Sequence, residues 1–323
     1  MILKRVRLQV FLGAMLFSAA SLAQDFPSGP IRMIVPWPAG GLVDIVGRSV
    51  GEQVSTELGR PVVVENKTGA GGMIGANAVL QAPPDGHTIG LTTTALNLNA
   101  ALQPKTSNGA ATDFEPVAVA AYAPLILVVG PSVKAGSLKD LVALAKSRPE
   151  GLTYASAGNG SPSHMAAELF KKVAGINLVH VPYKGAPAAM LDQVAGRVDL
   201  QFANAAVALP QIKRGGVKPI AVASAKRIES LPDVPTTAEA GVAGLESAQW
   251  IGFLAPKGTP PQVVAKLNAA VVKAIGQEKV QSALLSNGMQ VAQGKTPAEF
   301  RNEVARELEQ WQQVVREAGL EAQ

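Results

Sequence analysis

The chain has 323 residues, of which 47% are apolar and 16% are charged, and it contains no cysteine. The absence of cysteine excludes disulfides, thiolate metal ligands, a cysteine nucleophile and a lipid-modified N-terminal cysteine. The formal net charge is +5, but no cluster of Arg and Lys with interleaved aromatic residues occurs, which argues against a nucleic-acid partner.

The first 23 residues have the pattern of a secretory signal peptide. Lys4, Arg5 and Arg7 precede an apolar run over 10–20, and small residues follow up to Ala23. As a membrane anchor, this run is shorter than the roughly 20 residues that span a bilayer. We therefore expect cleavage after Ala23 and a periplasmic mature chain. That chain has 300 residues, 26 of them basic and 24 acidic, which is enough for two domains.

Apolar runs alternate with helical patterns along most of the remaining chain. Strands are expected at 31–35, 62–65, 88–92, 117–129, 152–156, 178–181, 200–203, 220–224 and 250–255. Helices are expected between them at 42–58, 72–81, 137–147, 163–174, 186–195 and 205–214. This alternation is typical of parallel sheets built from strand-helix-strand units.

The last 65 residues predict only helices, at 260–275, 277–286 and 296–318. Helices without strands of their own must cover a sheet made elsewhere, so the strand at 250–255 is expected to return to the first sheet. The sequence thus predicts an α/β protein with a discontinuous lobe 1 and a continuous lobe 2. Lobe 1 comprises 24–123 with 248–323, lobe 2 comprises 124–247, and hinge crossings lie near 120–127 and 247–254.

A glycine-rich loop follows the first predicted strand and leads directly into a helix with Asp44 in its first turn. Main-chain N–H groups at a helix N-terminus attract anions, and glycines let an anion approach them. The candidate ligand-binding residues of this loop are Trp37, Ala39, Gly40, Gly41 and Asp44. An ordinary strand-to-helix turn explains the glycines equally well.

A second loop of this kind, over 157–164, follows the strand at 152–156. Open α/β sheets bind ligands beyond the carboxyl ends of their strands, so two such loops suggest a cleft. The alternative is that a serine here merely caps the next helix. The candidate ligand-binding residues are Ala157, Gly158, Asn159, Ser161 and His164.

Uncharged or cationic side chains also gather at other predicted strand ends. Thr92, Thr93 and Thr94 end the third strand, and Asn204 ends the strand at 200–203. Such groups orient small polar ligands, although each is also an ordinary turn former. Lys184 is a further candidate that offers a cation, unless it is simply a solvated loop lysine.

Enzyme signatures are missing, so no catalytic residue, metal ligand or cofactor is predicted. There is no G-x-S-x-G, H-E-x-x-H or P-loop motif. The glycines at 69–75 depart from the dinucleotide fingerprint by one residue of spacing. Asp44, Ser161 or Ser163, and His164 have the residue types of a hydrolytic triad, but nothing in the sequence brings them together.

The motifs taken together closely resemble the extracytoplasmic solute receptors of tripartite tricarboxylate transporters, the Bug family, over essentially the whole mature chain. The motifs are Val35-Pro36-Trp37-Pro38-Ala39-Gly40-Gly41, Val64-Glu65-Asn66-Lys67, Pro84-Asp85-Gly86-His87, Tyr154-Ala155-Ser156-Ala157-Gly158-Asn159-Gly160-Ser161, His180-Val181-Pro182-Tyr183-Lys184-Gly185 and Ala255-Pro256-Lys257-Gly258. The resemblance implies a two-lobed periplasmic-binding fold of the second type, without a cofactor. It also implies that the two loops hold a ligand carboxylate through main-chain groups and ordered waters.

Two departures from the family pattern bear on the ligand. The family usually has Phe at the position of Trp37, and often Asp at the position of Ala203. Without that acid an amino-acid ligand lacks a counter-charge, which favours a di- or tricarboxylate or an aromatic acid. The expected protein is a monomeric receptor that delivers its ligand to a membrane permease. A sensory receptor for a membrane signalling partner and a secreted hydrolase are the alternatives.

Overall fold

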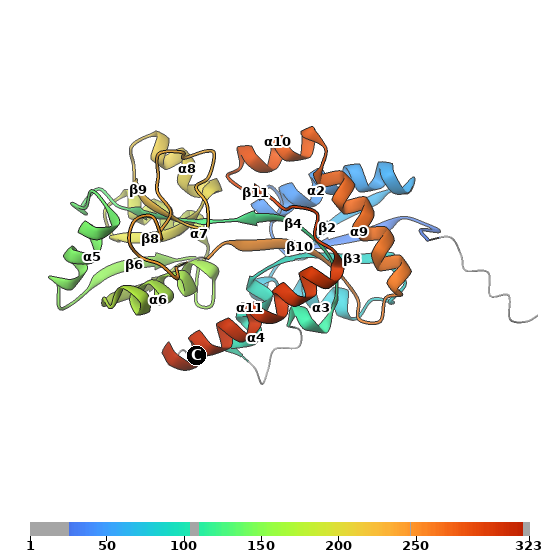
Figure 1. Cartoon of the computed structure of the whole chain (residues 1–323), viewed down its shortest axis with the longest axis horizontal. Helices are drawn as coiled ribbons and strands as arrows, with labels where there is room; N and C mark the ends of the chain where they lie inside the picture. Colours follow the sequence, from blue (N-terminus) through green and yellow to red (C-terminus); the bar gives the residue numbers. More distant parts are fainter. Residues whose placement is uncertain (1–25, 104–109, 246, 319–323) are drawn as a thin grey trace, which may run out of the picture.

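The protein is described by a computed structural model that covers residues 26–103, 110–245 and 247–318. The signal peptide expected at 1–23 lies outside the described residues. The described chain forms two sheets that lie side by side along the long axis of the molecule, each flanked by helices (Figure 1). Within these residues, no helix has the length and apolar character needed to cross a membrane. We call the part built on the first sheet lobe 1 and the other part lobe 2.

The first sheet has six strands in the order β11-β4-β10-β3-β1-β2. The parallel strands β1, β2 and β3 come from the N-terminal part of the chain, and β10 pairs antiparallel with both β3 and β4. The bounds are β1 (Ile31–Val35), β2 (Val62–Asn66), β3 (Thr88–Thr93), β4 (Glu115–Ala123), β10 (Gln249–Ala255) and β11 (Gln290–Val291).

Six helices and two short 3-10 turns accompany this sheet. One hydrophobic core joins side chains of the early strands to those of the C-terminal helices, for example Leu267 and Phe300. The C-terminal helices therefore pack on the first sheet and share its core. The elements are α2 (Leu42–Leu58), η2 (Ala70–Gly72), α3 (Met73–Leu80), α4 (Ala95–Leu102), η3 (Ala111–Asp113), α9 (Pro261–Ile275), α10 (Glu278–Ser286) and α11 (Pro297–Ala318).

The second sheet has five strands in the order β7-β6-β8-β5-β9. All five residues of its apolar strand β5, which lies between β8 and β9, are buried, as is typical of a strand covered on both faces. The elements of lobe 2 are β5 (Leu125–Val129), α5 (Leu138–Lys146), β6 (Leu152–Ser156), α6 (Pro162–Ala174), β7 (Leu178–Pro182), α7 (Ala186–Val194), β8 (Leu200–Asn204), α8 (Ala205–Lys213) and β9 (Lys218–Ala223).

The two-sheet α/β architecture predicted from the sequence is confirmed, with four corrections. The strand expected over 117–129 is two strands, β4 and β5, because Pro124 has no N–H for a sheet ladder and divides them. The sheets are mixed rather than parallel, because the strands that cross between lobes pair antiparallel with their neighbours. The short strand β11 lies in the C-terminal region expected to be purely helical, and α4 was not predicted.

Candidate functional site

The strand registers turn the carboxyl ends of both sheets toward each other. Strand β10 enters lobe 1 from lobe 2 and runs antiparallel to β3, so β3 and its parallel neighbours β1 and β2 end on the side of lobe 2. Strand β5 enters lobe 2 with Leu125 opposite Asn204, so β8, β6 and β7 end on the side of lobe 1. The loops that follow these ends therefore lie at the junction of the two lobes, where α/β folds bind ligands.

The loop after β1 is held from inside by Asp44, which is only 2% exposed. The main-chain N–H of Gly40 donates to Asp44 Oδ2 at 2.8 Å, and Arg48 Nε donates to the same oxygen at 2.9 Å. Asn66 Nδ2 donates to Asp44 Oδ1 and to the carbonyl oxygen of Trp37, both at 2.9 Å. The Asp44 carboxylate is thus used to fix the loop, a different role from the ligand contact expected from the sequence.

The electrostatics of this network keep Asp44 ionised. Burial of the carboxyl group opposes its ionisation, but hydrogen bonds from Arg48, Gly40 and Asn66 outweigh burial and lower the pKa of Asp44. Arg48 and Asn66 were not among the predicted site residues. The available signal was the position of Asn66 at the end of β2, beside the end of β1.

The outer surface of the same loop remains open. Ala39 and Gly40 are exposed, and a Cβ built on Gly40 has no neighbour within 4 Å. Gly41 is the N-cap of α2 and no side chain caps that helix, so N–H groups of its first turn point outward. Trp37 is partly exposed, and its indole Nε1 is buried without a partner among the described residues.

The three threonines at the end of β3, predicted either to orient a ligand or to form a turn, are buried. Thr93 Oγ1 accepts the N–H of Ala95 at 3.2 Å and so helps to start α4, while Thr94 Oγ1 donates to Glu307 Oε1 at 2.8 Å. Thr92 lies inside lobe 1. The hydroxyls of Thr93 and Thr94 therefore serve the start of an unpredicted helix and its contact with α11.

The loop over 157–161 satisfies most of its own main-chain donors. The N–H groups of Ala157, Gly158 and Gly160 donate to Ser163 Oγ (2.9 Å), Ser156 Oγ (3.1 Å) and His164 Nδ1 (3.1 Å). Ser161 N donates to the carbonyl of Gly158, and its hydroxyl caps α6. The loop expected to bind an anion thus uses most of its own N–H groups internally, and the exposed Asn159 lies at its tip. We call residues 157–161 the platform loop.

Three stacked aromatic rings, those of His164, His180 and Tyr154, lie behind this loop. His164 and His180 lie 4.2 Å apart, and His180 and Tyr154 lie 4.7 Å apart, all near parallel. His164 is 7% exposed, so it supports the loop rather than lining an open surface as expected. Burial lowers the pKa of His164, and burial together with the neighbouring His164 lowers the pKa of His180 to about 4.

The stack also contains a Ser–His pair, in which Ser156 Oγ and His180 Nε2 are 2.7 Å apart. Ser156 has no exposed surface, so no substrate reaches its oxygen. The triad considered from the sequence is not assembled either, because Asp44 is bonded within lobe 1 and His164 Nδ1 accepts from Gly160. The pair therefore fixes the loop.

Replacing His180 by glutamine is expected to flatten the loss of stability on acidification. With a lowered folded-state pKa, His180 leaves stability intact above its unfolded pKa of 6.5, and stability is lost as the pH falls toward about 4. Glutamine keeps a nitrogen near Ser156 Oγ but does not titrate. Thermal unfolding of both proteins between about pH 7 and pH 4 measures the difference, and superimposable pH profiles would contradict this assignment.

The remaining predicted residues lie at other strand ends of lobe 2. Asn204 is the N-cap of α8, where its Oδ1 accepts the N–H of Val207 at 3.3 Å. Lys184 is exposed in the loop that follows β7. Among the described residues, no group of three or more His, Asp or Glu side chains is arranged to hold a metal ion.

The lobes touch where α4 and α11 of lobe 1 meet the 157–161 loop and α6 of lobe 2. Near the platform loop, a Cβ built on Gly160 would lie 2.8 Å from Leu102 Cδ1 of α4. Met165 of α6 joins an apolar cluster with Leu98 of α4 and Trp311 of α11. The two predicted loops thus lie on the facing ends of the two lobes, and the contacts of Asp44 and His164 hold these loops in place.

Comparison with known proteins shows what this arrangement is similar to. Residues 46–320 match the family described as the tripartite tricarboxylate transporter family receptor. The structure of the periplasmic binding protein BugD has a TM-score of 0.79 at 35% identity, covering 92% of this chain and 100% of that one. An R. palustris protein solved with adipate gives 0.81 at 35% identity, covering 91% and 99%. MatC from Rhodopseudomonas palustris, with bound malate, gives 0.77 at 32% identity, covering 90% and 100%.

Proposed function

This chain belongs to the receptor family of tripartite tricarboxylate transporters, and on that basis we propose that it captures a small carboxylate between its lobes and delivers it to a membrane permease. The main support for this proposal is that two similar structures, each above 30% identity, contain adipate and malate. Both are dicarboxylates. The family consists of solute-binding receptors, so the protein is not an enzyme.

The ligand carboxylate binds at the loop after β1, against the uncapped first turn of α2. Gly40 has φ +76° and open space around it, so an anion approaches the main chain there without meeting a side chain. From lobe 2, the platform loop contributes its Asn159 tip, with Lys184 and Asn204 at neighbouring strand ends. Ordered waters supply the contacts that the internally bonded N–H groups of 157–161 no longer offer.

The ligand is a dicarboxylate, a tricarboxylate or an aromatic acid rather than an amino acid. An ammonium group needs a carboxylate nearby, and the end of β8 offers the buried Ala203 instead. The other candidate, Asp44, is already paired with Arg48.

Lobe closure on the ligand gives the permease a shape to recognise. We place the lobe boundaries where the sequence predicted them, with 24–123 and 248–323 in lobe 1 and 124–247 in lobe 2. BugD is a periplasmic binding protein, and we propose the same compartment here, with the signal peptide cleaved after Ala23 and a monomeric mature protein.

Thermal unfolding of the mature protein with mono-, di- and tricarboxylates, aromatic acids and amino acids tests this proposal. A ligand at about 100 times its Kd adds about 2.7 kcal/mol, which raises Tm by roughly 5 °C. Gly40→Leu is expected to remove that rise, because the new side chain occupies the anion's approach.

Gly59→Leu is the matched control, since Gly59 ends the same helix with φ +63° and equally open surroundings. Both variants carry similar backbone strain, but only one lies at the site. Equal loss of the ligand response in the two variants, or a wild-type Tm that no acid in the panel raises, would overturn the proposed function.

A further inference from the structure

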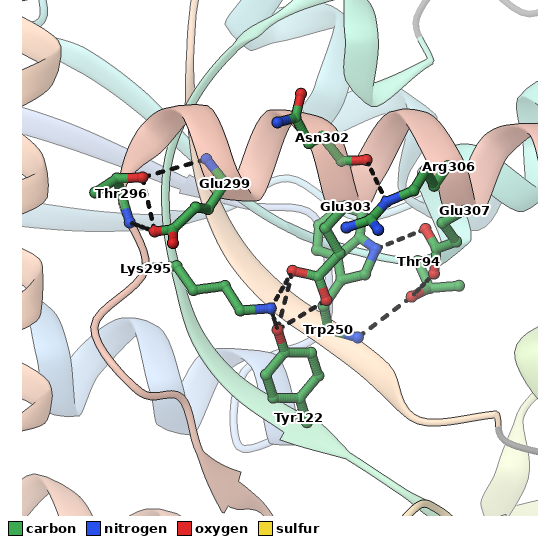
Figure 2. Close-up of polar contacts among 10 residues, drawn as sticks. All are labelled: Thr94, Tyr122, Trp250, Lys295, Thr296, Glu299, Asn302, Glu303, Arg306 and Glu307. Carbon is green, nitrogen blue, oxygen red and sulfur yellow. Dashed lines mark hydrogen bonds and ion pairs between the residues drawn. The ribbon is translucent and has the colours of Figure 1, made fainter.

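The last helix, α11, is fixed to both strands that cross between the lobes. Tyr122 of β4 and Trp250 of β10 lie opposite each other in the antiparallel pair of these two strands. Glu303 accepts the Tyr122 hydroxyl at 2.8 Å, and Glu307, one turn later, accepts Trp250 Nε1 at 2.6 Å. Figure 2 shows both carboxylates pointing from the helix toward these aromatic side chains.

Glu307 gathers three donors, one from β10 and two from the start of α4. Besides Trp250, its carboxylate accepts the Thr94 hydroxyl at 2.8 Å and Asn97 Nδ2 at 2.7 Å. The main-chain N–H of Trp250 also donates to Thr94 Oγ1 at 3.3 Å, which closes a ring of contacts. Burial of the Glu307 carboxyl group raises its pKa against the effect of these hydrogen bonds.

The ring of contacts is linked through α4 to the platform loop of lobe 2. Thr94 and Asn97 lie at the start of α4, whose far end at Leu102 meets Gly160 of the platform loop. A cavity of about 810 Å³ lies beside Glu307, between α11 and lobe 2, with Glu307, Leu169 and Ser224 among its lining residues. The lobes therefore have room to move beside α11, while the start of α4 is tied to the crossover.

We propose that Glu307 is a positioning residue for the ligand site, one that ties the turn after β3 and the start of α4 to the crossover strand β10. The proposal rests on the proposed function, because it concerns the site where the carboxylate binds. Without the Glu307 carboxylate, Thr94, Asn97 and Trp250 lose their common acceptor, and α4 no longer keeps its place relative to the hinge and to Gly160.

Two substitutions at Glu307 that differ in the contacts they keep test whether these contacts position α4. Two of the three donors, Asn97 Nδ2 and Trp250 Nε1, meet on the same oxygen, Oε2. Glutamine can keep an oxygen there and turn its amide nitrogen toward Thr94 Oγ1, whereas alanine keeps neither contact. Glu307→Gln is therefore the conservative variant, and Glu309→Ala, at an exposed glutamate on the same helix, is the control.

Calorimetric titration with adipate and malate, together with hydrogen exchange of the ligand-free protein, tests the proposal. Glu307→Ala is expected to weaken binding about tenfold and to speed exchange of the Trp250 indole and of the amides at the start of α4. Glu307→Gln is expected to bind within about threefold of wild type, and Glu309→Ala to match it. The indole signal is assigned with Trp250→Phe.

The outcomes separate the two claims. Wild-type affinity in Glu307→Ala despite fast indole exchange would overturn the positioning role, as would equal weakening in Glu309→Ala. If wild type binds neither acid nor any other of the panel, the proposed function falls. Hydrogen exchange at the start of α4 then tests whether Glu307 holds this helix against β10. Unchanged exchange there in Glu307→Ala would overturn that claim.

Discussion

Replacing Asp44 by alanine is expected to lower the free energy of unfolding by about 2–4 kcal/mol and to abolish the thermal response to carboxylates. The substitution removes the acceptor of the Gly40 N–H, of Asn66 Nδ2 and of Arg48 Nε. All three hydrogen bonds go to one ionised carboxylate, and such bonds contribute more to stability than bonds between neutral groups. Denaturant unfolding at constant slope measures the stability loss.

Asp140→Ala is the matched control for this prediction. Asp140 also lies in the first turn of a helix and accepts the N–H of the glycine four residues earlier, Gly136, at 3.2 Å. It is exposed, however, so water replaces its lost contacts. We expect a loss of about 1 kcal/mol there. Equal losses in the two variants would show that the buried network around Asp44 does not stabilise the loop after β1.

The pH dependence gives the same prediction a second readout. Because the folded-state pKa of Asp44 is lowered, its contribution is present above the unfolded value of 3.8 and is lost as the pH falls below it. Asp44→Asn is expected to remove this part of the acid sensitivity. A variant that stays as acid-sensitive as wild type would indicate that other groups cause the effect.

The sequence predicted the elements that carry periodic apolar patterns, because such patterns follow directly from burial. It failed at α4, where ALNLNAAL follows three threonines that look like the polar end of a strand. Thr93, a predicted ligand group, instead accepts the N–H of Ala95 at the start of this helix. Asn97 joins the helix to Val304 of α11 and to Ala111. Those partners are far along the chain, so local propensity does not reveal them.

The candidate site was predictable as a pair of loops, but not as a set of donors. Gly, Pro and Ser at strand ends indicated where the loops lie. Which N–H groups stay free depends on side chains such as Ser163 and His164, which turn back onto the platform loop. The network of Asp44 with Asn66 requires β1 and β2 to pair first. Residue types therefore predicted where the candidate loops lie, whereas the hydrogen bonds that each side chain makes depend on the tertiary structure.

Replacing Gly288 by alanine is expected to push the lobes apart and to weaken carboxylate binding. Gly288 follows α10 in lobe 1, and a Cβ built there would lie 2.2 Å from the Cβ of Ala205, the first residue of α8 in lobe 2. Two carbons need about 3.5–4.0 Å, so the lobes must separate by roughly 1.5 Å at this contact.

The expected loss of affinity follows from the cost of that overlap. Overpacking typically costs about 1–3 kcal/mol. Where the ligand-bound conformation carries this cost, the affinity falls by roughly fivefold to 150-fold. Calorimetric titration measures the affinity, and small-angle scattering of the ligand-free protein measures the separation. Gly258→Ala controls for backbone strain, since Gly258 also has a positive φ of 84° but no neighbour within 4 Å.

The double variant Gly288→Ala with Ala205→Gly removes the facing methyl group and is expected to restore most of the affinity. This rescue identifies the contact between lobes as the cause, because strain at Gly288 itself persists in the double variant. If the double variant binds as weakly as Gly288→Ala, backbone strain accounts for the loss. In that case the junction of α10 with α8 does not set the spacing of the two ligand loops.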